Sequence, residues 1–408
     1  MRPSVLVNSP VCHLLLMFSL TLFLAPFCFD SLLYSPLFSR SLHLRRLSRE
    51  FLLQNLQAGA DALMYFQQRI FPGLENSNDA YNVSIPCTYK ESKSLLSSPS
   101  PESIQLVITI ITTRRRPEYH YLLQVARGFL DRLSECGNDC SRFQIFICNV
   151  DPSPSYHTDA CLLSKILPSV EHYLHDEQED SFPNRFEREK QDYAFCLSRT
   201  LDAFTPDYVL LVEDDAVPHT DIFRAFFQLV QVRFTNAPLG GGLYAKFYHP
   251  ERLQGYLNPE PMRILEWFGV GILSGFLINW IYCNLFHKQR FSWHLFLAFS
   301  AYSMLLAELI GRHYLLELRR ISPAFYNVVP ATECCTPAML FSETSVRRTL
   351  AYLEEITCEA GYAKDTALYK ELSKRGEWAW AIEPNMVTHI GLFSTLRGAS
   401  EGEEPLLL

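Results

Sequence analysis

The sequence predicts an α/β domain that is interrupted by two adjacent membrane helices and preceded by a third. Short apolar, β-branched runs alternate with amphipathic stretches before residue 267 and after residue 310, as in βαβ units. Between these parts lie two apolar runs of about 20 residues, Trp267–Phe286 and Phe291–Ile310, each long enough to cross a hydrocarbon core of about 30 Å. A further apolar run, Val11–Phe29, follows Arg2.

Length and charge limit the class of protein. The chain has 408 residues with 48% hydrophobic content, enough for one large domain or two small ones. Its net charge of −8 at pH 7 argues against a nucleic-acid partner, which would require a concentrated basic face.

The N-terminal run predicts an uncleaved signal anchor. A cleaved signal peptide is the competing interpretation, since both begin with a basic residue and an apolar stretch. No small-x-small cleavage site follows Phe29, and the run is longer than the apolar core of most signals. We therefore expect a cytosolic tail at 1–10, a membrane span at 11–29, and a lumenal stem and linker at 30–103.

The two central runs predict a tight antiparallel hairpin, with spans at 267–286 and 291–310. Buried core helices are the alternative, but Trp267–Phe286 has no polar face. Lys288 and Arg290 make the turn at 287–290 basic, which favours the cytosol and places both flanks in the lumen. The arginines after the first span point the other way. The glycosylation sequon at Asn82 and the frequent cysteines favour the lumen.

The cysteines predict disulfides. Of twelve, Cys12, Cys28 and Cys283 lie in apolar spans, so an odd number remains, and at least one of these is free or pairs elsewhere. A zinc site is disfavoured because no Cys-x₂-Cys pair occurs. The candidates are Cys136 with Cys140 around a small loop, Cys148 and Cys196 as a staple of the core, and the adjacent Cys334 and Cys335, which form one vicinal bridge or two separate ones.

The α/β pattern occupies 104–266 and 311–408, so the hairpin is inserted into one domain. The first part predicts strands at 104–111, 143–150, 208–212 and 243–248, with helices at 118–133, 187–204 and 219–233. The second part predicts strands at 338–341, 378–382 and 387–392, with helices at 342–355 and 364–374.

Three adjacent carboxylates follow the third predicted strand. Val209–Val212 predicts a short buried strand, and it ends in Glu213-Asp214-Asp215. Adjacent negative charges repel one another unless a cation or solvent compensates them. At the carboxyl edge of a sheet, where ligands of α/β proteins bind, hard carboxylate oxygens suit Mn²⁺ or Mg²⁺. A solvated acidic turn is the alternative.

This arrangement resembles the DXD-type motif of GT-A glycosyltransferases in a Glu-Asp-Asp form. The resemblance implies that Asp215 contacts the metal that bridges a sugar-nucleotide diphosphate, while Glu213 and Asp214 position ribose, donor sugar or metal-bound water. It also implies a late metal ligand, His389, in a Val-Thr-His-Ile-Gly segment. A hydrogen-bonded core or surface histidine is the alternative.

The resemblance further implies a donor-binding loop and a catalytic base. Thr109, Thr112 and Arg114, from the first strand and its basic loop, would contact the uridine, and Asp151, at the end of the next strand, offers a base or ribose contact. The base would be Asp365 at a helix start, where an N-cap is the alternative role. Glu333 and Glu343 are the reserve candidates.

The assembly as a whole resembles the family of Golgi enzymes that add the N-acetylgalactosamine side chain to glycosylphosphatidylinositol (GPI) anchors. That resemblance runs from Val11 to about Arg397. It implies UDP-GalNAc as donor, Mn²⁺ or Mg²⁺ as cofactor, the first mannose of the GPI core as acceptor, and inversion. GPI-anchored proteins would be the partners, in a three-span Golgi membrane protein with a lumenal catalytic domain. An N-acetylglucosaminyltransferase acting on N-glycans and a non-catalytic membrane scaffold remain the alternatives.

Overall fold

The computed structural model describes residues 9–72, 104–172, 182–249, 261–287 and 291–391. The predicted sequon at Asn82 and the basic turn residues Lys288 and Arg290 lie outside these ranges.

The chain forms two compact units. One comprises Met1–Leu47 and Glu251–Ile321, and the other comprises Ser48–Pro250 and Ser322–Leu407. These divisions differ from the predicted domain boundaries, which followed the ends of the apolar runs.

The first unit, called here the membrane unit, contains three apolar helices. They are α2 (Pro10–Cys28), α9 (Pro261–Tyr282) and α10 (Trp293–Ile310), and a π turn, η9 (Cys283–His287), extends α9. All three are long and apolar enough to cross a membrane, as the sequence predicted. The ends differ slightly, because α9 begins at Pro261, before the predicted Trp267.

Helices α9 and α10 pack closely because α9 carries glycine at the contact. A Cβ atom at Gly271 would lie 2.3 Å from Met304 Cγ, and one at Gly275 would lie 2.5 Å from the backbone nitrogen of Ser300. Small residues four apart allow this approach between membrane helices. Trp267 Nε1 also donates to the Met304 carbonyl at 3.0 Å. The predicted hairpin therefore forms a tightly packed helix pair.

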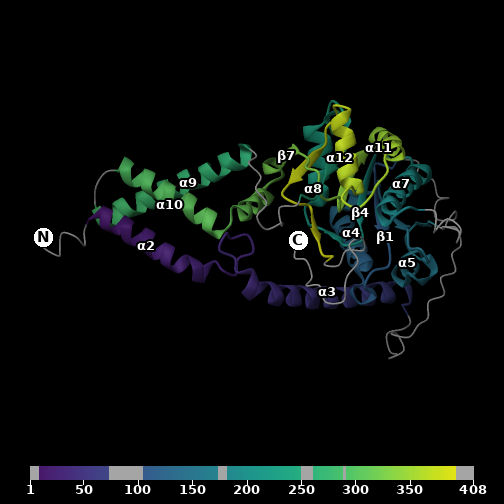
Figure 1. Ribbon diagram of the computed structural model, residues 1–408, viewed down its shortest axis with the longest axis horizontal. Coiled ribbons are helices and arrows are strands. Elements are labelled where there is room, and N and C mark those ends of the chain that lie inside the picture. Colours follow the sequence, from purple (N-terminus) through teal and green to yellow (C-terminus); the bar gives the residue numbers. More distant parts are fainter. Residues whose placement is uncertain (1–8, 73–103, 173–181, 250–260, 288–290, 392–408) are drawn as a thin grey trace. The chain divides into compact units, whose positions relative to one another are not determined.

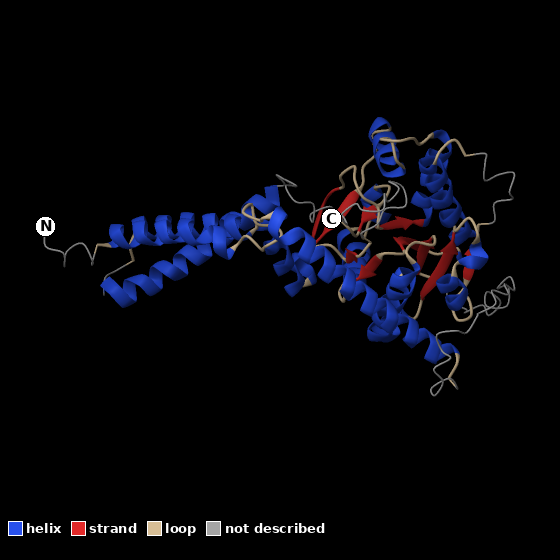
Figure 2. Ribbon diagram, turned by 60° about the horizontal axis from the view of Figure 1, so that its bottom comes forward, coloured by secondary structure: helices blue, strands red, loops and turns tan. Residues whose placement is uncertain are grey.

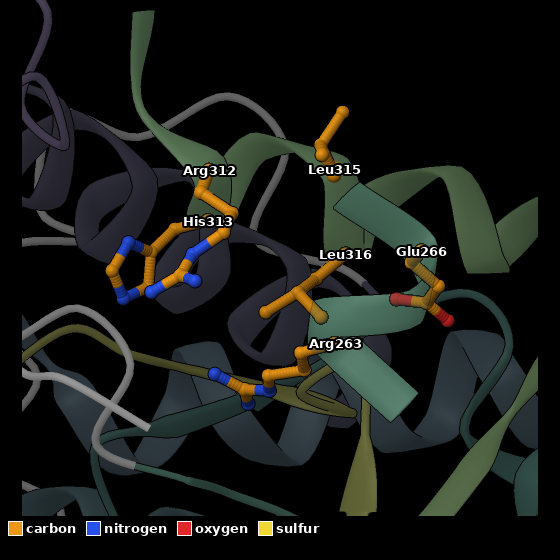
Figure 3. Close-up of a pocket in the computed structure, with 6 residues that line it drawn as sticks. All are labelled: Arg263, Glu266, Arg312, His313, Leu315 and Leu316. Carbon is orange, nitrogen blue, oxygen red and sulfur yellow. The ribbon is translucent and has the colours of Figure 1, made fainter. Parts of the chain in front are cut away.

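A 3-10 helix, η10 (Arg312–Ile321), follows α10. From it, Arg319 donates to Glu266 of α9 through Nε at 2.9 Å and Nη2 at 2.8 Å. Beside this pair lies a crevice of about 10 Å³, too small for a ligand. Figure 3 shows the six residues that line it: Arg263, Glu266, Arg312, His313, Leu315 and Leu316.

The second unit, called here the α/β unit, is built on a mixed sheet of eight strands (Figures 1 and 2). Their order across the sheet is β3-β2-β1-β4-β8-β6-β9-β7. The strands are β1 (Leu106–Thr112), β2 (Phe143–Asn149), β3 (Ser169–Glu171), β4 (Tyr208–Glu213), β6 (Ala245–Lys246), β7 (Asn327–Pro330), β8 (Ala338–Ser342) and β9 (Trp380–Glu383). A small separate sheet joins β5 (Ala216–Pro218) to β10 (Val387–His389).

Strand direction divides the sheet. The first part of the chain supplies β3, β2, β1 and β4, which pair in parallel as predicted. After the membrane helices the pattern changes, because β8 runs antiparallel to β4 and to β6. Apolar periodicity identifies a strand without giving its direction, so the sequence did not reveal this reversal.

Helices cover both faces of the sheet and begin or end at recognisable caps. The Asn184 side chain accepts from the nitrogens of Phe186 and Glu187 at the start of α7, and Ser342 with Ser345 forms a capping box on α11. The helices are α3 (Arg40–Ile70), α4 (Tyr121–Cys136), α5 (Thr158–Leu163), α7 (Arg185–Phe204), α8 (Ile222–Phe227), α11 (Glu343–Glu355) and α12 (Lys364–Lys374). The short turns are η3 (Pro117–Tyr119), η4 (Gly137–Cys140), η5 (Pro154–Tyr156), η6 (Gln228–Arg233), η7 (Pro238–Gly241) and η11 (Pro323–Phe325).

The core lies on both faces of β4. Leu210 and Val212 face a cluster that includes side chains of α4 and α8, whereas Val209 and Leu211 face one that includes side chains of α7 and α11. Burying each such side chain contributes about 1.5–3 kcal/mol. The uninterrupted apolar run therefore makes a central strand, and it fixes the position of the acidic residues that follow.

The second half of α3 belongs to the α/β unit, although residues 30–103 were predicted to be stem and linker. Ala62 and Phe66 are buried in the core cluster around β1. Asn55 Nδ2 also donates to the carbonyl of Ile390 at 2.9 Å. The glutamines and small residues around these positions give no continuous apolar face that would have predicted a core helix.

The disulfide candidates pair within the α/β unit. Cys136 bonds to Cys140, Cys148 of β2 bonds to Cys196 of α7, and Cys334 bonds to Cys335 as a vicinal bridge. Cys358 is a free, buried thiol, in agreement with the odd count.

Candidate active site

The acidic residues lie at the carboxyl edge of the parallel strands. Register places Ile111 of β1 opposite Glu213 of β4, and Thr112 opposite Asn149 of β2. Side chains that end three neighbouring strands therefore meet at one edge, where ligands bind in α/β sheets.

Asp214 is an anchored carboxylate. Its Oδ2 accepts from Thr112 Oγ1 at 2.7 Å and from the backbone nitrogen of Thr113 at 3.3 Å, and its Oδ1 pairs with Arg115 Nη2. Thr112 Oγ1 also lies 2.8 Å from His157 Nε2. These contacts fix Asp214 and supply the positive charge that its burial requires.

Asp215 is held by the small sheet. Its carbonyl accepts from the backbone nitrogen of Ile390 at 2.8 Å, and Ala216 pairs with His389 across β5 and β10. The chain approaches so closely that a Cβ at Gly391 would lie 2.0 Å from Asp215 Oδ2. Glycine at 391 is therefore needed for the carboxylate to occupy this place.

The Asp215 carboxylate is fully buried beside Arg115 and His389. Arg115 Nη1 lies 2.8 Å and His389 Nε2 lies 3.4 Å from its Oδ2. Burial alone would raise the pKa of Asp215, but the charges of Arg115 and His389 outweigh it and hold that pKa well below its usual range. In the same way, burial opposes protonation of His389 while Asp215 raises the pKa of His389 overall.

Glu213, Asp215 and His389 form a group suited to a divalent metal. One ligand atom from each lies within 4.8 Å of the others. Asp215 Oδ1 is buried without a hydrogen-bond partner, and two carboxylates with one imidazole form a donor set that Mn²⁺ accepts. These residues fit the predicted metal. Burial, opposed in part by Lys364 and reinforced by Asp215, raises the pKa of Glu213, so a cation here would favour its ionised form.

A cavity of about 380 Å³ opens beside this group, within the range of ligand pockets. Thr112, Arg115 and Asp214 line one part, while Arg188 of α7 and Lys364 of α12 line another. Lys364 Nζ lies 2.5 Å from Glu189 Oε1 and 3.5 Å from Glu213 Oε1. The cavity thus combines carboxylates with cations that are able to bind phosphate.

The predicted donor-binding residues are only partly brought together. Thr112, Glu213 and Asp214 line the cavity. Asp151 is buried nearby, and its Oδ2 accepts from the backbone nitrogen of Arg114 at 2.8 Å.

Two of the predicted donor contacts are not supported by the geometry. The Arg114 side chain is exposed and does not line the cavity, because the turn directs the next residue, Arg115, inward. Thr109 lies in the middle of β1, and its Oγ1 is buried 2.7 Å from Thr200 Oγ1 of α7, away from the sheet edge.

The structure places the three candidate bases in different parts of the α/β unit. Asp365 lies at the start of α12, where its Oδ2 accepts from the backbone nitrogen of Cys335 at 3.1 Å and its Oδ1 from that of Thr366 at 2.8 Å. The N-cap of α12 is Ala363, so Asp365 lies in the first turn and is not the N-cap that was its alternative role. It supports the loop whose Thr336 donates to Glu213 Oε1 at 3.4 Å. Glu333, in the same loop, is exposed.

Glu343 is excluded as a base. It follows Ser342, which pairs with Tyr208 at the start of β4, whereas Ala338 pairs with Val212 near the acidic end. The antiparallel direction of β8 therefore places Glu343 at the opposite edge of the sheet.

Sequence reasoning missed Arg115, Lys364 and Gly391. The run of three arginines indicated a basic loop without showing which side chain turns inward. No local pattern marks Lys364, which meets Glu213 only through the packing of α12. Gly391 lies two residues after the predicted ligand His389. A glycine at such a position is the one available signal that another part of the chain approaches the backbone closely.

The comparisons with known proteins identify the family of the chain. Residues 106–388 match the family described as GPI-N-acetylgalactosamine transferase PGAP4. The chain belongs to this family. The match runs from β1 to β10 and includes α9 and α10, so two of the three candidate membrane helices lie within the matched region, and α2 lies before it. The chain is accordingly a glycosyltransferase, as the resemblance implied, and the family's name gives N-acetylgalactosamine as the sugar and GPI as the acceptor.

Two solved structures are also similar. The apo form of mouse xyloside xylosyltransferase 1 is 11% identical, with 68% of this chain and 84% of that chain covered and a TM-score of 0.30. The apo bifunctional glycosyltransferase WbbM is 12% identical, with 66% of this chain and 37% of that chain covered and a TM-score of 0.28. Likenesses at these TM-scores carry no weight for the mechanism.

Proposed function

We propose that this chain transfers N-acetylgalactosamine from UDP-GalNAc to the first mannose of the GPI core, with inversion and with Mn²⁺ or Mg²⁺ as cofactor. The observation that carries the proposal is the buried Asp215 carboxylate. Both of its oxygens are buried without a hydrogen bond, and it lies in a potential ligand group with Glu213 and His389. The adjacent cavity has room for a sugar nucleotide.

The residues around the cavity have different roles in donor binding. Glu213, Asp215 and His389 would hold the metal, which when bound offsets the negative charge that develops on the leaving diphosphate. Asp214 remains anchored by Thr112 and maintains the turn that presents Asp215. Arg188 and Lys364 line the cavity and supply positive charge for phosphate oxygens.

Asp365 is the proposed base. Backbone nitrogens hold both of its oxygens, which limits its rotation and leaves lone pairs for a further partner. It would accept the proton of the mannose hydroxyl as the hydroxyl oxygen bonds to the anomeric carbon and the bond from that carbon to UDP breaks. Attack from the face opposite UDP gives inversion. Glu333 is the alternative base.

Donor screening tests the reaction. Purified full-length enzyme in nanodiscs should transfer sugar from UDP-GalNAc to a defined GPI acceptor, lose activity in EDTA and regain it with Mn²⁺. Preference for UDP-GlcNAc would contradict the donor assignment. Absence of transfer from any donor would support a scaffold instead.

A pair of variants tests the base. Asp365→Asn should lower kcat by about 100- to 10,000-fold with little change in the KM for UDP-GalNAc, whereas Glu333→Gln should retain most activity. The reverse result would assign the base to Glu333.

We also propose that the α/β unit is lumenal and that the enzyme resides in the Golgi membrane. The basic turn between α9 and α10 and the sequon at Asn82 support this orientation. Asn82 should carry a glycan, while a sequon engineered beside Lys288 should stay unmodified. A glycan at the turn would reverse the assigned topology.

A further inference from the structure

One buried arginine occupies the position of a counter-ion at the metal group. Arg115 Nη1 lies 2.8 Å from Asp215 Oδ2, and Nη2 pairs with Asp214 Oδ1. The guanidinium thus bridges two carboxylates of the acidic triplet. The Arg115 side chain is 14% exposed and that of Asp215 is 1% exposed, so solvent screens this contact little.

Other cations do not replace Arg115 here. Lys364 is shared between Glu189 and Glu213, at 2.5 and 3.5 Å. His389 contacts Asp215 Oδ2 at 3.4 Å, but the same imidazole must be neutral to bind a metal. Arg115 therefore provides the main fixed positive charge for the pair of carboxylates Asp214 and Asp215.

A divalent ion on Asp215 would bring two more positive charges close to this guanidinium. The metal ion and the Arg115 guanidinium would both be in contact with Asp215, and two positive charges so close together repel strongly in a buried site. Arg115 lines the cavity, so its side chain can turn from the carboxylates toward a ligand held there. A nucleotide diphosphate would offer the guanidinium a new anionic partner in bidentate geometry.

We propose that Arg115 is an exchangeable counter-ion that couples metal binding to nucleotide binding. Without nucleotide it neutralises Asp214 and Asp215 and weakens metal binding. When the diphosphate enters, Arg115 pairs with the phosphate oxygens and Asp215 becomes available to the metal. Metal and nucleotide then bind cooperatively. This inference rests on the proposed metal-dependent transfer.

Manganese binding tests the coupling without measuring catalysis. Free Mn²⁺ is followed by electron paramagnetic resonance during titration of the purified full-length enzyme, with and without UDP. The wild type should bind Mn²⁺ weakly alone and at least about tenfold tighter with UDP, within the usual range of coupling between sites. Arg115→Gln should bind Mn²⁺ at least about tenfold tighter than the wild type without UDP, because the competing charge is gone. In Arg115→Gln, UDP should increase the affinity for Mn²⁺ by a smaller factor than it does in the wild type.

Two variants control for charge and folding. Arg116→Gln removes a charge from the neighbouring, exposed position and should titrate like the wild type. Arg115→Lys keeps the charge and should bind Mn²⁺ weakly without UDP, so it tests the proposal even where Arg115→Gln fails to fold.

The outcomes separate the inference from the proposed function. If Arg115→Gln binds Mn²⁺ no tighter than the wild type, or if Arg115→Lys binds it tightly without UDP, the counter-ion role is wrong and the metal site stands. If no variant binds Mn²⁺ with or without UDP, the metal-dependent mechanism itself is wrong.

Discussion

Two arginines, the buried Arg319 in the membrane unit and the partly buried Arg115 in the α/β unit, make the same kind of contact in different surroundings. In the membrane unit, Arg319 meets the single carboxylate of Glu266 with two hydrogen bonds. In the α/β unit, Arg115 bridges Asp214 and Asp215, and Glu213 is adjacent. The first pair borders a crevice of about 10 Å³, and the second borders a cavity of about 380 Å³.

The difference lies in charge balance and in available space. Arg319 and Glu266 bring one charge of each sign together and join two segments. At the acidic triplet, Arg115 is shared by Asp214 and Asp215, and Lys364 is shared by Glu189 and Glu213, so each of these cations serves two carboxylates. The cavity beside them admits a ligand. Shared cations beside an open cavity therefore indicate a binding site better than a one-to-one ion pair does.

Removing the proposed metal-ligating carboxylate should have the largest effect. Asp215→Asn keeps the shape of the side chain but removes its charge, and transfer should fall by about 1000-fold or more. Sugar addition to GPI in cells that lack the endogenous enzyme measures this, with unchanged protein level and unchanged subcellular location as controls. Near-normal addition would show that the acidic group in the α/β unit is as structural as the pair in the membrane unit.

Displacing the same carboxylate should have the next largest effect. Gly391→Ala puts a methyl group where a Cβ would meet Asp215 Oδ2 at 2.0 Å. A shift of about 1 Å in a catalytic group costs on the order of 100-fold, so we expect a loss of about 10- to 100-fold in kcat/KM. The matched control is Gly269→Ala in α9, where the added methyl meets nothing within 4 Å. Full activity of the Gly391 variant would mean that Asp215 tolerates displacement.

Breaking the balanced pair should affect stability more than catalysis. Arg319→Gln leaves Glu266 without its partner and should lower the free energy of unfolding by about 1–3 kcal/mol. Thermal unfolding in nanodiscs measures the loss, while kcat for the folded fraction should remain unchanged. The double variant Arg319→Met with Glu266→Met should recover much of the stability, because no unpaired charge remains. A selective fall in kcat would give the membrane-unit pair a role in the reaction.

The smallest effect is expected at the opposite edge of the sheet. Glu343 forms an exposed pair with Arg347 one helical turn away, and such pairs contribute about 0.5 kcal/mol or less. Glu343→Gln should change stability by no more than that and transfer by less than about twofold. A large loss of transfer would contradict the placement of Glu343 away from the site.

The sequence by itself determined the local elements and the chemistry at their ends. The apolar run Val209–Val212 predicted a central strand. The three carboxylates after it predicted a cation or solvent that compensates their negative charge. The lengths of the apolar runs gave the three membrane helices within a few residues. The spacing of cysteines indicated the disulfide candidates. Each of these follows from neighbouring residues alone, through periodicity, length or charge repulsion.

Only the tertiary structure decided which distant residues complete the site. His389 was expected there on resemblance, but its contact with Asp215 depends on the pairing of β5 with β10. The inward turn of Arg115, the approach of Lys364 and the need for glycine at 391 arise from packing between segments far apart in the chain. Because β8 runs antiparallel to β4, Glu343 lies at the opposite edge of the sheet from the acidic residues. Asp365 instead contacts the loop that contains Thr336. Strand direction and packing distance depend on contacts across the whole sheet, and such contacts leave no local pattern in a sequence.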